Sequence, residues 1–260
     1  MNRNAKTSWL LLAPLLSAVL LLETGCPAFR PQRYPNFVTP TPVAENSYLI
    51  VGFMSGLEAW DKDRPVRKFA LRLRAMNLPG VHVETVENWH WRLAVRLIRN
   101  ALDRNQDGKL DEQERASARV ILYGHSWGGA AVVKTARRLK KMGVPVLLTV
   151  QTDSVGIDDN VIPSNVARAV NFYQDSWVFV RGRSRIRAED PQKTTILGSF
   201  RCSYRNKKVD RSGLFWPIKV LGGDHMKLAF DPDVWAQIEA LVLREIQPPA
   251  GPRAASPARR

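Results

Sequence analysis

The sequence predicts an α/β fold, with a mostly parallel sheet of about six strands and helices on both of its faces. Short apolar segments rich in β-branched residues alternate along the chain with longer segments of helical periodicity. The chain has 260 residues, 45% of them hydrophobic, so it can bury one sizeable core. We therefore expect one folded domain, over residues 46–246.

Six segments have the composition of buried strands. They lie near residues 48–52, 80–86, 119–124, 144–150, 167–173 and 216–221. Helical periodicity is clearest over residues 89–102, 130–139 and about 233–245. Because little of the chain precedes the first strand, we expect a compact domain without further antiparallel edge strands.

The third strand leads into the hexapeptide Gly124-His125-Ser126-Trp127-Gly128-Gly129, and a helix follows directly. A strand, a G-x-S-x-G turn and a helix in this order are typical of a nucleophile elbow. The glycines let the backbone pack closely around a strained serine, whose hydroxyl projects at the end of the sheet. We expect Ser126 to be a nucleophile and the amide of Trp127 to face the place where an oxyanion forms.

A serine nucleophile needs a neutral imidazole to take its proton, and in elbow proteins this histidine follows both the serine and the acid. The chain has four histidines. His125 adjoins the serine, where its ring should point away from the nucleophile, while His82 lies in a strand-like segment and His90 opens a helix. His225 lies in a loop after the last predicted strand, so it is the predicted base.

With these residues the chain resembles the α/β-hydrolase superfamily, in particular its lipase, esterase and thioesterase-like members, over residues 46–246. The resemblance implies a Ser-His-Asp triad that cleaves an ester, thioester or lipid acyl bond through an acyl-enzyme. Lipases place the acid after the strand that follows the elbow, which is Asp153 here. Many other members place it one strand later, at Asp175 here. We favour Asp153, with Asp175 as the alternative.

The second oxyanion donor is expected in the loop after the first strand. The family usually carries a His-Gly pair there, whereas this chain has Val51-Gly52. By position the donor is the amide of Phe53 or of Met54, and the departure from the family pattern leaves both open. Loss of one such donor costs about 3–4 kcal/mol in comparable hydrolases.

A second motif lies between the helix at 89–102 and the elbow strand. Residues 103–114 match the calcium-loop pattern D-x-[DN]-x-[DN]-G-x5-E at every defined position. The expected oxygen ligands, the lysine through its carbonyl, are Asp103, Asn105, Asp107, Lys109, Asp111 and Glu114. The segment resembles an EF-hand or dockerin-like loop, although barely a turn of exiting helix fits before the strand. We expect a structural Ca²⁺ site with a Kd of about 10⁻⁴ to 10⁻³ M, and no organic cofactor.

Both ends of the chain have compositions typical of segments outside a folded domain. Residues 1–26 resemble the leader of an exported protein or lipoprotein, with a basic start, an apolar stretch and Cys26 after a glycine, as in a lipobox. Glu23 departs from the lipobox pattern, so lipidation of Cys26, plain cleavage and retention as an anchor stay open. Residues 27–45 are expected to be a Pro-rich tether, and residues 247–260 a disordered basic tail.

The leader predicts an exported protein of the cell envelope or periplasm, anchored in the membrane if Cys26 is acylated. If Cys26 is neither acylated nor removed, a disulfide between Cys26 and Cys202 is the alternative. The net charge of +15 favours anionic partners, but the lack of a recognised nucleic-acid motif argues against nucleic acid. The expected partners are a small-molecule or lipid acyl substrate and an anionic membrane surface.

Part of the positive charge follows the fifth predicted strand, in four arginines at strand spacing: Arg181, Arg183, Arg185 and Arg187. One interpretation is an anion-facing surface beside the active site, suited to acidic lipid headgroups or phosphorylated substrates. The other, which the residue pattern favours, is a charged edge strand that keeps sheets from aggregating.

Two functions stay open at this point. The first is an exported serine hydrolase with a structural calcium site. The second is a non-catalytic, calcium-dependent surface-binding lipoprotein on a hydrolase scaffold. A fluorophosphonate probe distinguishes them, because only an activated serine is labelled.

Overall fold

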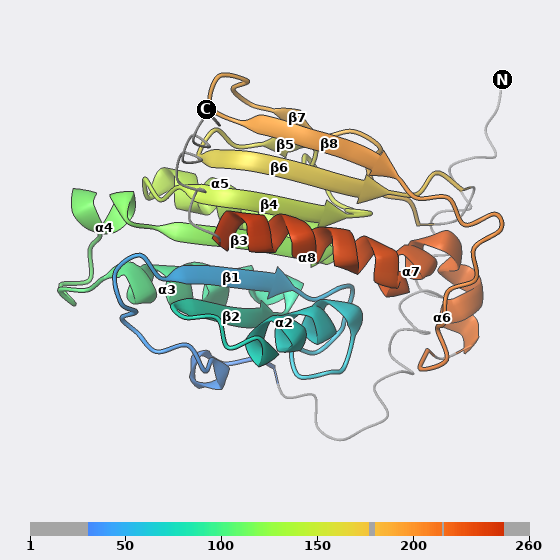
Figure 1. The fold of residues 1–260 in the computed structure, drawn as a ribbon, viewed down its shortest axis with the longest axis horizontal. Helices are drawn as coiled ribbons and strands as arrows, with labels where there is room; N and C mark the ends of the chain where they lie inside the picture. The colour runs from blue at the N-terminus through green and yellow to red at the C-terminus, as the bar shows by residue number, and fades with distance from the viewer. Residues whose placement is uncertain (1–30, 177–179, 215, 247–260) are drawn as a thin grey trace, which may run out of the picture.

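The computed structural model describes residues 31–176, 180–214 and 216–246 of the chain. Within these ranges a six-stranded sheet with the order β2-β1-β3-β4-β6-β8 forms the centre of the molecule (Figure 1). Its strands are β1 (Tyr48–Phe53), β2 (Val81–Val86), β3 (Arg119–His125), β4 (Val146–Thr152), β6 (Val166–Tyr173) and β8 (Thr195–Arg201). Every neighbouring pair is parallel, which confirms the predicted parallel sheet.

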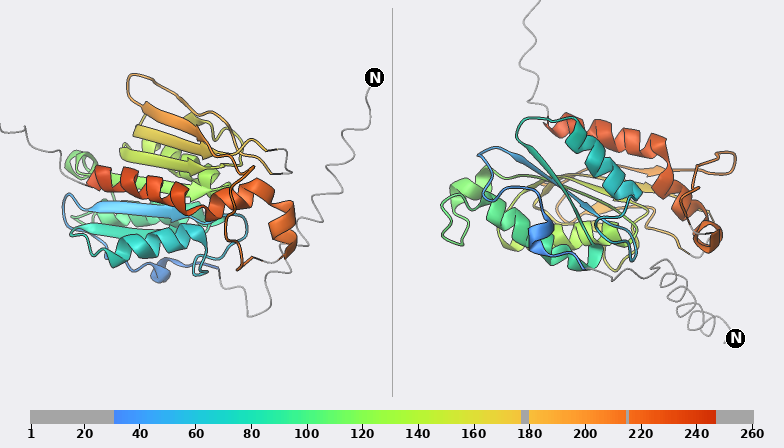
Figure 2. Two further views of the ribbon diagram at one scale, coloured as in Figure 1. Left: turned by 45° about the vertical axis from the view of Figure 1, so that its right-hand side comes forward. Right: turned by 90° about the horizontal axis from the view of Figure 1, so that it is seen from below.

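Helices cover both faces of the sheet, as predicted. The long ones are α2 (Pro65–Ala75), α3 (Trp91–Leu102), α5 (Trp127–Lys141) and α8 (Pro232–Ile246). Figure 2 shows α2 and α8 on one face and α3 and α5 on the other. The shorter elements are η1 (Tyr34–Asn36), η2 (Asn88–His90), α4 (Glu112–Ala116), α6 (Trp216–Leu221), α7 (Gly223–Phe230) and the paired β5 (Val161–Ile162) and β7 (Arg187–Ala188).

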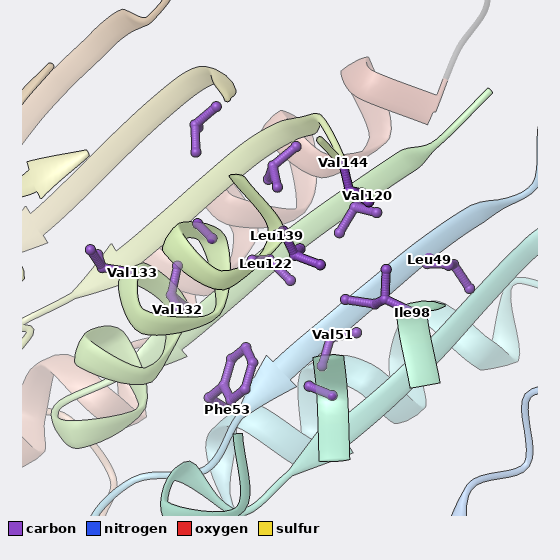
Figure 3. Packing of buried hydrophobic residues seen from close by; sticks show 14 of the residues in the cluster. Leu49, Val51, Phe53, Ile98, Val120, Leu122, Val132, Val133, Leu139 and Val144 are labelled. Atoms are coloured by element: carbon purple, nitrogen blue, oxygen red, sulfur yellow. The ribbon is translucent and has the colours of Figure 1, made fainter. Parts of the chain in front are cut away.

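Alternate residues of β1 fill the two halves of the core, because successive side chains of a strand point to opposite faces. Leu49, Val51 and Phe53 pack with side chains of α3 and α5, as Figure 3 shows. Ile50 packs on the other face, with side chains of α2 and α8 that include Phe69. β1 is therefore held between two layers of helices, and so is the start of the loop that follows it.

The prediction of a strand at 216–221 is wrong, because these residues form helix α6. Pro217 lies in the first turn of α6, where its fixed φ suits a helix and its missing amide costs nothing. No residue of α6 is buried, whereas a strand of the central sheet would be covered by helices. The sixth strand is β8, an edge strand whose residues are half-buried or exposed. Its sequence, TILGSFR, includes a glycine and few β-branched residues, so it was not predicted as a strand.

The described part of the predicted tether, residues 31–45, packs against the domain. The backbone amides of Val38 and Thr39 donate to the carboxylate of Glu84 on β2, at 2.8 and 2.7 Å. Val43 is 6% exposed and belongs to the core. The prediction of a tether is wrong over these residues, because side chains of the sheet satisfy their backbone donors and the core takes up Val43.

The leader at 1–26, including Cys26, and the tail at 247–260 lie outside the described residues, so the roles assigned to them stay predictions. Cys202 is a free thiol in the described part of the chain. Among the helices of that part, none is long and apolar enough to cross a membrane.

Candidate active site

Ser126 lies on the turn between β3 and α5, in a backbone conformation that non-glycine residues rarely adopt. Its φ is 56° and its ψ is -123°. Its amide donates to the carbonyl of Thr152 at the end of β4, at 3.0 Å, which ties the turn to the sheet. This is the strained strand-turn-helix geometry that the G-x-S-x-G motif predicts.

Close backbone contacts require two of the glycines of this motif. A Cβ on Gly124 would lie 2.5 Å from the carbonyl carbon of Gly128, and a Cβ on Gly128 would lie 2.1 Å from the carbonyl oxygen of Phe53. Both distances are below 3.0 Å, which real Cβ atoms essentially never show. The elbow therefore packs directly on the end of β1, and this contact brings the loop after β1 next to Ser126.

Asp153 and His225 form a buried pair at the carboxyl end of the sheet. Oδ2 of Asp153 lies 2.6 Å from Nδ1 of His225. The same carboxylate accepts from the amide of Gly182 at 2.9 Å and from Nε2 of Gln174 at 3.1 Å. Burial alone would raise the pKa of Asp153, but the hydrogen bond and charge of His225 outweigh it and hold this pKa below its ordinary value. An ionised Asp153 keeps the proton of His225 on Nδ1 and leaves Nε2 as the basic nitrogen.

The prediction that His225 lies in a loop is wrong, but its predicted partner, Asp153, lies beside it. His225 lies in helix α7 rather than in a loop, and α7 lies at the carboxyl end of the sheet (Figure 1). The alternative acid, Asp175, is on the surface, where Nε of Arg201 binds it at 2.9 Å. Of the two candidate acids, it is Asp153 that meets the predicted base.

The sequence pattern did not reveal that His125 contacts His225. The two rings stack with centroids 4.5 Å apart and planes at 35°. Nδ1 of His125 lies 3.2 Å from Oγ1 of Thr152, and the residue is 1% exposed. Burial, followed by the charge of His225, lowers the pKa of His125 to about 3, so this ring is neutral near pH 7. The other histidines, His82 and His90, lie on β2 and η2.

Both amides proposed for the second oxyanion donor lie at the end of β1. The amide of Met54 donates to the carbonyl of Val86 at 2.9 Å. Phe53, labelled in Figure 3, is the last residue of β1 and pairs with Val86 on β2 and Gly124 on β3. The choice between these two amides therefore stays a prediction. Trp127 is the first residue of α5, so its amide has no acceptor in a preceding helical turn and lies at the positive end of the helix dipole. Both features suit an oxyanion donor.

The predicted calcium loop connects α3 to the short helix α4. The amide of Gly108 donates to Oδ2 of Asp103 at 3.0 Å, and Asp111 and Glu114 form a capping box at the start of α4. Gly108 has a φ of 82°, in the left-handed region that glycine adopts readily. Oδ1 of Asp103 is buried and has no hydrogen-bond partner among the described residues. This oxygen faces no donor in the folded loop.

Glu114, the expected bidentate ligand, binds backbone amides instead. Its Oε1 accepts from Arg104 at 2.7 Å and from Asn105 at 3.3 Å, and its Oε2 accepts from Asp111 at 3.1 Å. Across the described ranges, no three His, Cys, Asp or Glu side chains converge as metal ligands. The oxygen donors suit Ca²⁺, but binding would require Glu114 to exchange these amides for the ion. Occupancy of the loop therefore stays a prediction.

No family model matches the chain, and no curated protein sequence matches it. A cutinase-like protein from Cryptococcus sp. is similar in structure, with 14% identity and a TM-score of 0.43 over 80% of this chain and 98% of that one. The RedJ thioesterase of the prodiginine pathway in Streptomyces coelicolor has 12% identity and a TM-score of 0.41, over 85% and 95%. An acetyl xylan esterase has 10% identity and a TM-score of 0.40, over 77% and 99%. The chain's own parallel sheet, with a serine on the strained turn between β3 and α5, is an α/β-hydrolase-like fold.

Proposed function

We propose that the protein is a serine hydrolase that cleaves an ester, thioester or lipid acyl bond through an acyl-enzyme. One observation carries the proposal. The buried pair of Asp153 and His225, 2.6 Å apart, lies at the same end of the sheet as the strained Ser126. A nucleophile, a base and a carboxylate that orients the base are the groups that acyl transfer requires.

In the proposed reaction, Oγ of Ser126 attacks the acyl carbon while Nε2 of His225 takes the hydroxyl proton. Asp153 stabilises the imidazolium that forms, and the amide of Trp127, together with that of Phe53 or Met54, donates to the oxyanion of the tetrahedral intermediate. His225 then returns the proton to the alcohol or thiol as it leaves. Water, deprotonated by the same imidazole, attacks the acyl-enzyme and releases the acid and the free serine.

Labelling with a fluorophosphonate probe tests the proposal, with Ser126→Ala as its control. We expect the wild type to be labelled and the variant not. Nitrophenyl esters of graded chain length then identify the acyl group that is preferred. A folded wild type that neither reacts with the probe nor cleaves an ester would favour the second candidate, a non-catalytic, calcium-dependent surface-binding lipoprotein on a hydrolase scaffold.

We also propose that residues 103–114 bind Ca²⁺ in a structural role. The buried Oδ1 of Asp103, without a hydrogen-bond partner among the described residues, favours this, because a buried carboxylate oxygen is costly unless a donor or a cation compensates it. The loop holds four carboxylates that repel each other without a cation: Asp103, Asp107, Asp111 and Glu114. Calorimetric titration at millimolar calcium measures this binding directly.

Export to the cell envelope, with acylation of Cys26, is a further proposal, supported by the composition of residues 1–26. Partition of the full chain into a detergent phase tests it. We expect Cys26→Ser to move the protein to the aqueous phase, and equal partition of both forms would argue against acylation.

A further inference from the structure

A pocket of about 420 Å³ lies beside the elbow. It is lined by residues 154–156, which follow β4, and by residues 181–184, from the segment that connects β6 to β8. Two of the lining residues, Arg181 and Arg183, are exposed arginines. The pocket therefore combines a position near the proposed nucleophile with two guanidinium groups.

Both lining segments are bonded directly to the proposed catalytic residues. The amide of Val155 donates to the carbonyl of Ser126 at 3.1 Å, and the amide of Gly182 donates to Oδ1 of Asp153 at 2.9 Å. A Cβ on Gly182 would lie 2.4 Å from the carbonyl carbon of Asp153. This close approach, which only a glycine permits, holds the two flanking arginines beside the site.

The pocket carries more positive than negative charge. Nε of Arg183 lies 3.5 Å from Oδ1 of Asp159, a buried carboxylate that also accepts from the hydroxyl of Ser154 at 2.6 Å. Arg181 has no carboxylate partner among the described residues. Asp159 thus offsets at most one of the two guanidinium charges, and an anionic ligand can interact with the other.

The interpretation of these arginines as a charged edge strand is wrong. Of the four, only Arg187 lies in a strand, the two-residue β7, and the edge of the main sheet near them is β8. Arg185 and Arg187 lie outside the pocket lining but are exposed arginines of the same segment. They provide a matched control for Arg181 and Arg183.

We infer that this pocket binds an anionic oxygen group of the substrate, a carboxylate or a phosphate, and that acyl substrates carrying such a group are preferred over neutral ones of equal length. Guanidinium groups bind both kinds of anion through paired N–H donors. The inference rests on the proposed hydrolase function, because the bound anion would orient the acyl group relative to Ser126.

The kinetic test compares 4-nitrophenyl butyrate with the 4-nitrophenyl monoester of succinic acid, which has equal chain length and a terminal carboxylate. In the wild type we expect kcat/KM to be about tenfold higher for the succinyl ester. Arg181→Gln/Arg183→Gln should abolish this preference, and Arg185→Gln/Arg187→Gln should keep it. Equal preference in the wild type and the first variant, or equal loss in both variants, would overturn the inference.

A binding test separates failure of this inference from failure of the proposed function. Calorimetric titration of Ser126→Ala with succinate and with inorganic phosphate measures the pocket without turnover. We expect a Kd on the order of millimolar for at least one anion, weakened about fivefold or more when Arg181→Gln/Arg183→Gln is added. The tighter of the two anions identifies the group recognised. Anion binding, combined with a wild type that hydrolyses no ester, would refute the proposed hydrolase function but support the inference about the pocket. Ester hydrolysis by the wild type without anion binding would overturn the inference about the pocket alone.

Vesicles of phosphatidylglycerol test the competing role of a membrane surface. If the inference holds for Arg181 and Arg183, both double variants should bind such vesicles as well as the wild type does. Equal loss of vesicle binding in both, with the ester preference unchanged, would assign all four arginines to a membrane surface and overturn the inference.

Discussion

Replacing Asp153 by asparagine should disable the proposed base while leaving it in position. Oδ1 of Asp153 accepts from the amide of Gly182, so the carbonyl oxygen of asparagine is expected to take its place. The NH₂ group then replaces Oδ2, which lies 2.6 Å from Nδ1 of His225 and 3.1 Å from Nε2 of Gln174. An NH₂ group there loses the hydrogen bond from Gln174 and donates to Nδ1, so the proton of His225 moves to Nε2, which can no longer accept the proton of Ser126.

The expected loss is a factor of about 10² to 10⁴ in kcat, or about 2.7–5.4 kcal/mol of transition-state stabilisation. Steady-state kinetics with a 4-nitrophenyl ester measures it. Asp175→Asn is the matched control, because this carboxylate lies on the surface and binds only Arg201 among the described residues. The control should change the rate by less than about twofold. A larger loss in the control, or more than about a tenth of wild-type activity in Asp153→Asn, would refute the assignment of the acid.

The same variant has an expected pH signature in stability. Because His225 holds the pKa of Asp153 below its ordinary value, the ionised carboxylate stabilises the fold at pH values above its unfolded pKa of about 3.9. This contribution is lost as the pH falls through the lower, folded-state pKa. The urea midpoints of wild type and Asp153→Asn should therefore differ near pH 7 and converge on acidification. A difference in urea midpoint that is independent of pH would contradict the coupling between the ionisation of Asp153 and the stability of the fold.

Three further results are expected. Ser126→Ala and His225→Ala should each leave less than about a tenth of the hydrolysis rate with an unchanged circular dichroism spectrum, and a higher rate in either would remove that residue from the mechanism. Calcium at a hundredfold excess over Kd should stabilise the wild type by about 2.7 kcal/mol, which raises Tm by several degrees, but should not stabilise Asp103→Ala/Glu114→Gln. An unchanged Tm of the wild type, without heat of binding, would show that residues 103–114 do not bind calcium. Gly128→Ala should lower the free energy of unfolding by about 1–3 kcal/mol, measured in urea, because its Cβ would collide with the backbone of β1. A loss below about 0.5 kcal/mol would show that the backbone around residue 128 can move to accommodate a methyl group.

Local patterns were sufficient for the parallel sheet and for the elbow. Five of the six predicted strands form close to their predicted ranges, because each is rich in the β-branched and apolar residues that a sheet covered on both faces can bury. The elbow follows from the glycines at 124 and 128, where a side chain would collide with backbone atoms. These requirements act within a few residues of the chain, so one sequence suffices to recognise them.

Only the packing of distant elements decided between Asp153 and Asp175 as the partner of His225. The interacting residues are 72 positions apart, and their contact depends on how α7 packs on the end of the sheet, which no local spacing encodes. The stacking of His125 on His225 has the same origin.

The segments without a strong local preference were likewise decided by their surroundings. The apolar residues at 216–221 suit a helix as well as a strand, and in the fold they form the unburied helix α6. Arg181 and Arg183 have the same sequence spacing as Arg185 and Arg187. The contact of Gly182 with Asp153 places the first pair at the pocket, because a tertiary contact can separate residues that periodicity makes equivalent.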